Sequence, residues 1–383
     1  MSESLTMFDV FRHHKKHLAI SLIVFSLLIP VFDAIVIQRD RNRNMVYGEL
    51  FWQEGLGVYE LNDEDLFHNY SVPEDHLLTG VLNVTYEYPI VTLLFFAGLS
   101  ALEPGSFGPT HYLVNFVLVV LVHLNLVLFI YLGQEYRERK WFKQIFAFYY
   151  SIGFLYSVAF GKVEPLAEFL MLATLVLFKQ NRKWMGFGTL ALAVQTKIYP
   201  AMVFPILFSI APLESIAFFA VTAVGTIPLV LFGMSYSSLI AHLLNSPGYA
   251  QLITNPFYIG LIPMNPISTF GSLFLVWGFL CAITEPNRIG PIPLPSLKLR
   301  TRDWRTIYIC ALPLILLAIS WTQVWYYTWF IVPFLLIRTP EDMASFRYVF
   351  AAIWVAHFAG IFLNIEYFLA GPIAELLEHL RPL

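Results

Sequence analysis

The sequence has few charged residues. Asp, Glu, Lys and Arg make up 13% of its 383 residues, whereas they approach a quarter of an ordinary soluble domain. A net charge of -3 provides no basic surface for nucleic acid. Two cysteines without a CxxC pair provide neither a disulfide framework nor a cysteine metal site. Long polar tracts are also missing, so we expect no separate soluble domain.

Apolar residues are abundant instead. They account for 58% of the chain, and they recur in runs near the roughly 20 residues that cross a bilayer. The sequence therefore predicts one all-α integral membrane domain over residues 1–383, a multispanning bundle of about 11 transmembrane helices. The predicted spans are 18–37, 110–133, 144–160, 164–178, 184–197, 199–211, 214–233, 267–285, 306–321, 323–337 and 346–364.

Lysine and arginine set the orientation of these spans, because cytoplasmic loops of membrane proteins are rich in both. With the N-terminus inside, 17 of the 23 basic residues fall on the cytoplasmic side. They are Arg12, Lys15, Lys16, Arg137, Arg139, Lys140, Lys143, Lys179, Arg182, Lys183, Arg288, Lys298, Arg300, Arg302, Arg305, Arg338 and Arg347.

The apolar segment 89–102 is the exception, since its fourteen residues are short for a crossing. Counting it as a span would reverse every later loop and place 17 basic residues outside. We therefore expect a re-entrant or interfacial helix there, within a first outer loop over residues 38–109. Such a helix is tolerated at membrane depth where protein buries it or where it lines a cavity.

Several basic residues on the outer side run against the orientation rule. An anion at the membrane edge, most simply a lipid phosphate, would explain them, because arginine grips phosphate with two nitrogens and lysine meets it as a point charge. The alternative is that these side chains reach out to lipid headgroups. Lys197 stands out because "QTKIYPAMVFP" places it between two apolar runs, three residues before Pro200. The cations are Arg39, Arg41, Arg43, Lys162 and Lys197.

Carboxylates accompany these cations. Asp40 follows the first span by a few residues, where a loop can aim it into a cavity at the membrane edge, so it is the candidate general base. A local ion pair with a neighbouring arginine is the alternative. Asp63 and Asp65 lie in a longer polar stretch that we expect to be solvated. Glu164, two residues after Lys162, either lines the cavity and contacts a substrate hydroxyl or merely complements a helix dipole.

An aromatic string, "WTQVWYYTWF", covers residues 321–330. Tryptophan and tyrosine at a membrane interface usually form its aromatic belt. Because aromatic rings also stack on sugar faces, Gln323 and Trp329 are candidate pocket residues as well.

Taken in order, these stretches resemble the GT-C superfamily of polyprenyl-phosphate-sugar-dependent glycosyltransferases. Within it, the chain is similar to the catalytic subunit of glycosylphosphatidylinositol (GPI) mannosyltransferase I and its archaeal relatives. The resemblance covers about residues 30 to 340. It is carried by "EGLGVY" (54–59), "TYEYP" (85–89), "GKVEPLAEFLMLATLVL" (161–177), "QTKIYPAMVFPI" (195–206) and "TQVWYYTWFIVP" (322–333).

The resemblance implies a mannosyltransferase, or a transferase of a similar hexose. Its donor would be dolichyl or polyprenyl phosphate sugar, its acceptor a glycolipid or glycan, and its active face extracytoplasmic or lumenal. Asp40 would take the acceptor's proton in an inverting reaction, with Asp63 or Asp65 as alternatives. The residues implied at the donor phosphate are Lys197, Arg39, Arg41 and Lys162. Those implied at the substrates are Tyr86, Glu87, Tyr88, Glu164, Gln323 and Trp329. We expect no metal and no cofactor.

Two other functions compete with the transferase. A transporter or flippase of lipid-linked intermediates would also need intramembrane charge and broken helices, but it would place ionisable residues at the bilayer midplane. An inactive GT-C-like accessory subunit is the second alternative. The expected partners are the lipid-linked donor, the acceptor, membrane lipids and a small membrane subunit, but no nucleic acid. The expected location is the cell membrane of a prokaryote or the endoplasmic reticulum membrane of a eukaryote.

Overall fold

The structure, a computed structural model, describes residues 6–36, 38–73, 85–103, 111–231, 304–312 and 329–336. Within these ranges the chain is helical, and its extended contacts are limited to isolated bridges such as that between Asn62 and Thr85. The α-helices are α1 Met7–Ile35, α2 Arg39–Glu54, α3 Asp63–Tyr70, α4 Ile90–Leu102, α5 Tyr112–Leu132, α6 Lys140–Phe154, α7 Glu164–Lys179, α8 Lys183–Val194, α9 Phe204–Ile210, α10 Ile216–Leu231 and α14 Trp304–Ala311.

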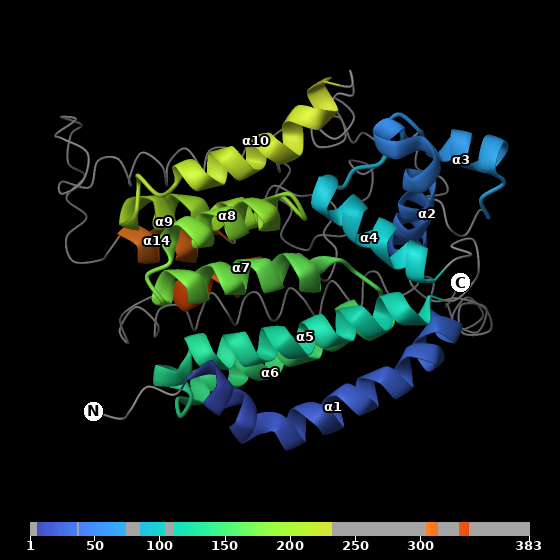
Figure 1. The fold of residues 1–383 in the computed structure, drawn as a ribbon. Coiled ribbons are helices and arrows are strands. Elements are labelled where there is room, and N and C mark those ends of the chain that lie inside the picture. The colour runs from blue at the N-terminus through green and yellow to red at the C-terminus, as the bar shows by residue number, and fades with distance from the viewer. Residues whose placement is uncertain are drawn as a thin grey trace, which may run out of the picture.

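The long apolar helices form a bundle. Helices α1, α5, α6, α7, α8 and α10 run lengthwise beside one another, whereas α2, α3 and α4 gather at one end, opposite the N-terminus (Figure 1). Among the described residues two helices, α1 and α5, are long and apolar enough by themselves to cross a membrane. This supports a helical membrane protein, and the number of crossings stays a prediction.

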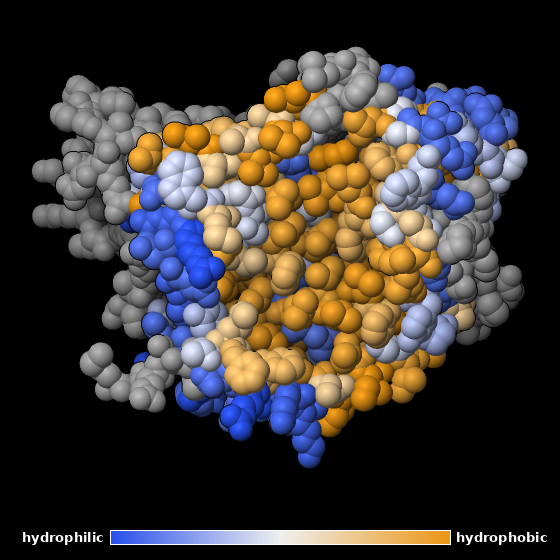
Figure 2. Space-filling model, viewed as in Figure 1, coloured by the Kyte–Doolittle hydropathy of each residue, from blue (hydrophilic) through white to orange (hydrophobic). Residues whose placement is uncertain are grey.

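The outer surface of the bundle suits lipid. On α1 the side chains of Ile20, Ile23 and Leu27 are exposed at helical spacing, and Phe219 and Val224 are exposed on α10. Figure 2 shows a broad hydrophobic band across the visible face, with hydrophilic residues at both ends of the bundle. This pattern is typical of a surface that meets the acyl chains in its middle and water at its ends.

The apolar runs of the sequence match these helices closely. The predicted span 110–133 is α5, the span 164–178 is α7, and the short apolar segment 89–102 is α4. Helix α4 has thirteen residues, which extend only about 20 Å, so it is too short for a simple crossing. The predicted spans 267–285 and 346–364 lie outside the described residues.

The sequence predicts an outer loop at the arginine-rich stretch 38–44, but the structure forms helix α2 there. It forms a helix because partners from other elements neutralise its charges, among them Asp33 for Arg41 and Asp63 for Arg43. Its packing against α4 is very close at Gly48, where a Cβ atom would lie 2.6 Å from the backbone carbon of Phe96. Glycine is the residue that permits this crossing.

Candidate active site

Two predicted motifs meet at the end of the bundle that carries α2 and α4. The N–H of Val91, in the first turn of α4, donates to the carbonyl of Gln195 at 3.0 Å. The Thr92 hydroxyl donates to the carbonyl of Thr196 at 2.7 Å. The first bond satisfies a backbone N–H at the N-terminus of α4 that has no partner within the helix. Together the two bonds tie the start of α4, which directly follows "TYEYP", to "QTKIYP".

A third motif, "GKVEP", reaches the same place through Gly161. This residue has a φ of +56°, and a Cβ atom would lie 2.6 Å from Gln38 Oε1 and 2.8 Å from Arg41 Cβ. Only glycine combines this left-handed backbone with such a close approach. The turn presses the next residue, Lys162, against the start of α2, where its ammonium group pairs with the Asp40 carboxylate.

Four charged side chains come together here, and we call them the charge quartet: Asp40, Lys162, Glu164 and Lys197. Besides the pair of Lys162 with Asp40, the Lys197 ammonium pairs with Oε1 of Glu164. Exposure differs among them. The Glu164 side chain is 0% exposed and Lys162 is 7% exposed, while Lys197 and Asp40 are 17% and 26% exposed. A substrate that approaches the quartet therefore meets Asp40 and Lys197 first.

The charges of the quartet act on one another. Burial alone would raise the pKa of Asp40, but Lys162 outweighs it, with help from Lys197 and Arg43, and brings that pKa below its ordinary value. Burial lowers the pKa of Lys162, while Asp40 and Glu164 oppose this shift. Asp40 is therefore held as a carboxylate at neutral pH, as a proton acceptor must be.

Aromatic rings surround Lys197. Its ammonium group lies 5.6 Å from the centre of the Tyr88 ring and 5.8 Å from that of Trp329. Trp329 in turn stacks on Tyr199, with ring centres 5.0 Å apart and planes within 3°. Oε2 of Glu164 and the Tyr199 hydroxyl are both buried, and neither finds a hydrogen-bond partner among the described residues. Polar groups in this state can still accept or donate a bond to a ligand.

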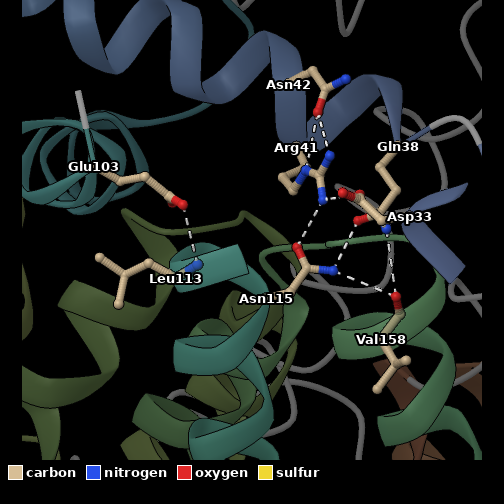
Figure 3. A network of polar contacts seen from close by, with 8 residues as sticks. All are labelled: Asp33, Gln38, Arg41, Asn42, Glu103, Leu113, Asn115 and Val158. Carbon is tan, nitrogen blue, oxygen red and sulfur yellow. Dashed lines mark hydrogen bonds and ion pairs between the residues drawn. The ribbon is translucent and has the colours of Figure 1, made fainter. Parts of the chain in front are cut away.

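Arg41, expected beside the phosphate-binding cations, lies in a different network. All three of its guanidinium nitrogens are engaged: one donates to Asp33 at 2.5 Å and to Asn115 at 3.1 Å, and the other two donate to Asn42 at 2.8 and 2.9 Å. The side-chain amide of Gln38 donates to Asp33 and to the carbonyl of Val158, and it accepts from Asn115, which also donates to Val158 (Figure 3). We call this group the anchor network: Asp33, Gln38, Arg41, Asn42, Asn115 and Val158.

Arg43 is also fully occupied by the protein. It pairs with Asp63 at 3.0 Å and with Glu87 at 2.6 Å, and it donates to the carbonyl of Thr85. The Tyr86 hydroxyl donates to Asn44 of the same helix at 2.7 Å. Of the predicted substrate residues, Tyr86 and Glu87 therefore fasten their segment to α2, while Tyr88 faces Lys197.

The remaining predicted residues are accounted for as follows. Asp63 was expected to be solvated, but it is buried because Arg43 neutralises it. The Asp65 carboxylate accepts from the Asn62 N–H and caps α3. Arg39 is half-buried in the first turn of α2, and Gln323 lies outside the described residues.

Sequence reasoning missed Asp33 and Asn115 altogether. Both are polar residues within predicted apolar spans, and this is the signal that could have revealed them, because intramembrane polar groups seek partners in the protein.

A model of glycosyltransferase family 87 matches residues 86–284, which is just over half of the 383-residue chain. The matched region includes Tyr88, Lys162, Glu164 and Lys197, whereas Asp40 and Trp329 lie outside it. No curated protein and no solved structure matches the chain.

Proposed function

The chain belongs to glycosyltransferase family 87, and on that premise we propose that it transfers a hexose, with mannose the first choice, from dolichyl or polyprenyl phosphate to a glycolipid or glycan. The charge quartet carries this proposal. It combines a proton acceptor with cations suited to a phosphate, beside α2 and α4, the helices at the end of the bundle opposite the N-terminus (Figure 1). That end is the extracytoplasmic or lumenal face in the orientation that the basic residues favour.

Lys197 is the proposed partner of the donor phosphate. Its ammonium group is partly exposed and lies near two aromatic rings at the membrane edge. The phosphate carries one negative charge in the donor and gains a second as the bond to the sugar breaks. A fixed cation stabilises this growing charge most in the transition state, and this is the kind of interaction that accelerates a reaction.

Asp40 is the proposed general base. It takes the proton of the acceptor hydroxyl while the hydroxyl oxygen attacks the anomeric carbon from the face opposite the phosphate. The bond from that carbon to the phosphate oxygen breaks as the new glycosidic bond forms, so the anomeric centre is inverted. The lowered pKa of Asp40 keeps its carboxylate ionised at neutral pH.

The aromatic residues are proposed to bind the sugar. Tyr88 and Trp329 lie near Lys197, and a hexose attached to the phosphate would meet their rings. Tyr86 and Glu87 support Tyr88 through their bonds to α2. Arg41 acts through the anchor network, which holds the turn of α2 that carries Asp40.

The preference for mannose and for a GPI-type glycolipid rests on the sequence resemblance described above. Radiolabelled dolichyl-phosphate mannose, mixed with the purified protein and a total lipid extract in liposomes, tests the proposal. We expect label to move to a new lipid with the wild type and not with Asp40→Asn. Transfer from a nucleotide sugar instead would refute the lipid-linked donor. Passage of the labelled donor across the bilayer without a new glycosidic bond would favour a flippase.

A further inference from the structure

The phosphate partner proposed above is already occupied. In the structure the Lys197 ammonium is paired with Glu164. A donor phosphate that binds Lys197 must therefore compete with this carboxylate, because two anions beside one ammonium group repel each other. What becomes of Glu164 when the donor arrives decides how the site works.

Glu164 cannot simply be released into water. Its side chain is 0% exposed, and Oε2 already finds no hydrogen-bond partner among the described residues. A buried carboxylate without a cation is strongly unfavourable. Glu164 therefore needs another positive charge close by.

Lys162 is that charge. It precedes Glu164 by two residues, and the Glu164 carboxylate counteracts the effect of burial on its pKa, as Asp40 does. Lys162 is held in place by the turn at Gly161 and is only 7% exposed. Lys162 thus lies within the electrostatic reach of both carboxylates, although its ion pair in the structure is with Asp40, and that of Lys197 is with Glu164.

We propose that donor binding exchanges the ion pairs of the charge quartet: the phosphate takes Lys197, Glu164 turns to Lys162, and Asp40 is released as the base. This inference rests on the proposed function and names how the same site is switched on. Before the donor binds, Lys162 keeps Asp40 paired and out of reaction. Glu164 is thus a positioning residue that couples the phosphate position to the base.

The charges balance throughout the exchange. The quartet alone is neutral, and it carries one net negative charge once the donor phosphate is bound. Transfer moves the acceptor proton to Asp40 and leaves a second negative charge on the phosphate, so the net charge of the site does not change. Because Lys162 leaves Asp40 only when the phosphate takes Lys197, an acceptor hydroxyl finds an available base only after the donor phosphate is bound. This binding order limits premature reaction at the site.

The isosteric variant Glu164→Gln tests the exchange, because it removes the competing charge and keeps the shape. In lipid nanodiscs, equilibrium binding of radiolabelled dolichyl phosphate should tighten by about tenfold. Mannose transfer should fall by about tenfold or more, because nothing then draws Lys162 away from Asp40. A residue with a merely structural role would not move these two measurements in opposite directions.

Two further variants sharpen the test. Glu168→Gln is the matched control, since Glu168 is a buried glutamate one turn further along α7 that accepts from Tyr149 at 2.7 Å. It should not tighten dolichyl phosphate binding. Adding Lys162→Met to Glu164→Gln should restore part of the lost transfer, because Asp40 then has no ammonium to hold it.

The outcomes separate the two proposals. If the wild type transfers mannose but Glu164→Gln binds dolichyl phosphate equally or more weakly, the exchange is wrong and the proposed function stands. Unchanged transfer in Glu164→Gln also refutes the exchange. If the wild type neither binds dolichyl phosphate nor transfers mannose, the proposed function itself fails.

Discussion

Asp40 and Arg41 are neighbours in the chain, yet they belong to polar networks of opposite character. Arg41 is 1% exposed, and its three guanidinium nitrogens all have partners within the anchor network. Asp40 is 26% exposed and belongs to the charge quartet, in which one oxygen of Glu164 lacks a partner among the described residues. Arg41 has no guanidinium nitrogen left for a ligand, while the quartet still offers an oxygen of Glu164.

Helix geometry explains how adjacent residues come to differ so much. Successive side chains on an α-helix point about 100° apart, so the first turn of α2 sends Asp40 and Arg41 toward different surroundings. Arg41 reaches α1 and α5 through Asp33 and Asn115. Asp40 reaches Lys162 beside the turn at Gly161. One turn of helix thus holds α2 against the bundle and presents the base.

The largest expected effect comes from Asp40→Asn, which keeps the shape and removes the proton acceptor. Mannose transfer should fall by about 10²-fold or more, while the temperature of thermal unfolding changes little. Asp63→Asn is the matched control, because Asp63 pairs with Arg43, which lies outside the quartet. Near-normal transfer by Asp40→Asn, with loss of transfer in Asp63→Asn, would move the base to Asp63.

The next effect is on stability and comes from Arg41→Met. Removing one partner of a buried ion pair leaves Asp33 unpaired, which costs about 3 to 5 kcal/mol in the free energy of unfolding. Thermal unfolding in detergent should therefore occur at a markedly lower temperature, with part of the transfer activity kept per folded molecule. If stability were unchanged and donor binding were lost, Arg41 would belong to the phosphate site and the contrast between the two networks would disappear.

Lys197→Met comes third. The variant keeps most of the side-chain packing and removes the contact with the donor phosphate, worth about ten- to a hundredfold in transfer. It also leaves Glu164 without its ion-pair partner, so thermal unfolding is measured alongside transfer. The loss should appear with every acceptor, because the donor is common to all of them, and Lys197→Arg should recover part of it. Unchanged donor binding and transfer in a well-folded Lys197→Met protein would reduce "TKIYP" to a turn at the membrane edge.

The sequence allows some of these elements to be predicted and hides others. Apolar runs predict α4, α5 and α7, because burial in lipid or protein selects a nearly continuous run of apolar residues. The orientation rule then places Lys162, Glu164 and Lys197 at one end of the bundle. Their actual pairing depends on contacts between residues far apart in the chain, such as Lys162 with Asp40, and no local pattern encodes those.

The stretch before and within α2 shows where this reasoning stops. Asp33 is an isolated charged residue near the end of an apolar run, and the arginines of residues 39–43 have the pattern of a solvated loop. Each makes sense only together with its partner, because Asp33 neutralises Arg41 and Asp63 neutralises Arg43. A polar segment can form a buried helix when charged residues of distant segments pair with its own. Hydropathy is calculated for each segment alone, so it does not predict such a helix.

The smallest expected effect concerns the pH dependence of transfer, which reports the ionisation of Asp40 in the charge quartet. Asp40 works as a base only when ionised, so transfer is lost as the pH falls through its pKa. Burial raises that pKa and Lys162 more than offsets it, so the acid limb of kcat/KM for the donor should lie below the ordinary range of an aspartate.

In Lys162→Met the effect of burial is left without this compensation, and the acid limb should move to higher pH. In the wild type, the acid limb of kcat should likewise lie at higher pH than the acid limb of kcat/KM, because the bound donor draws Lys162 away from Asp40. Lys183→Met is the matched control, because Lys183 begins α8 and lies 4.0 Å from Glu214, outside the quartet, and it should leave the profile unchanged. An acid limb that stays in place in Lys162→Met would show that the titrating base is not Asp40.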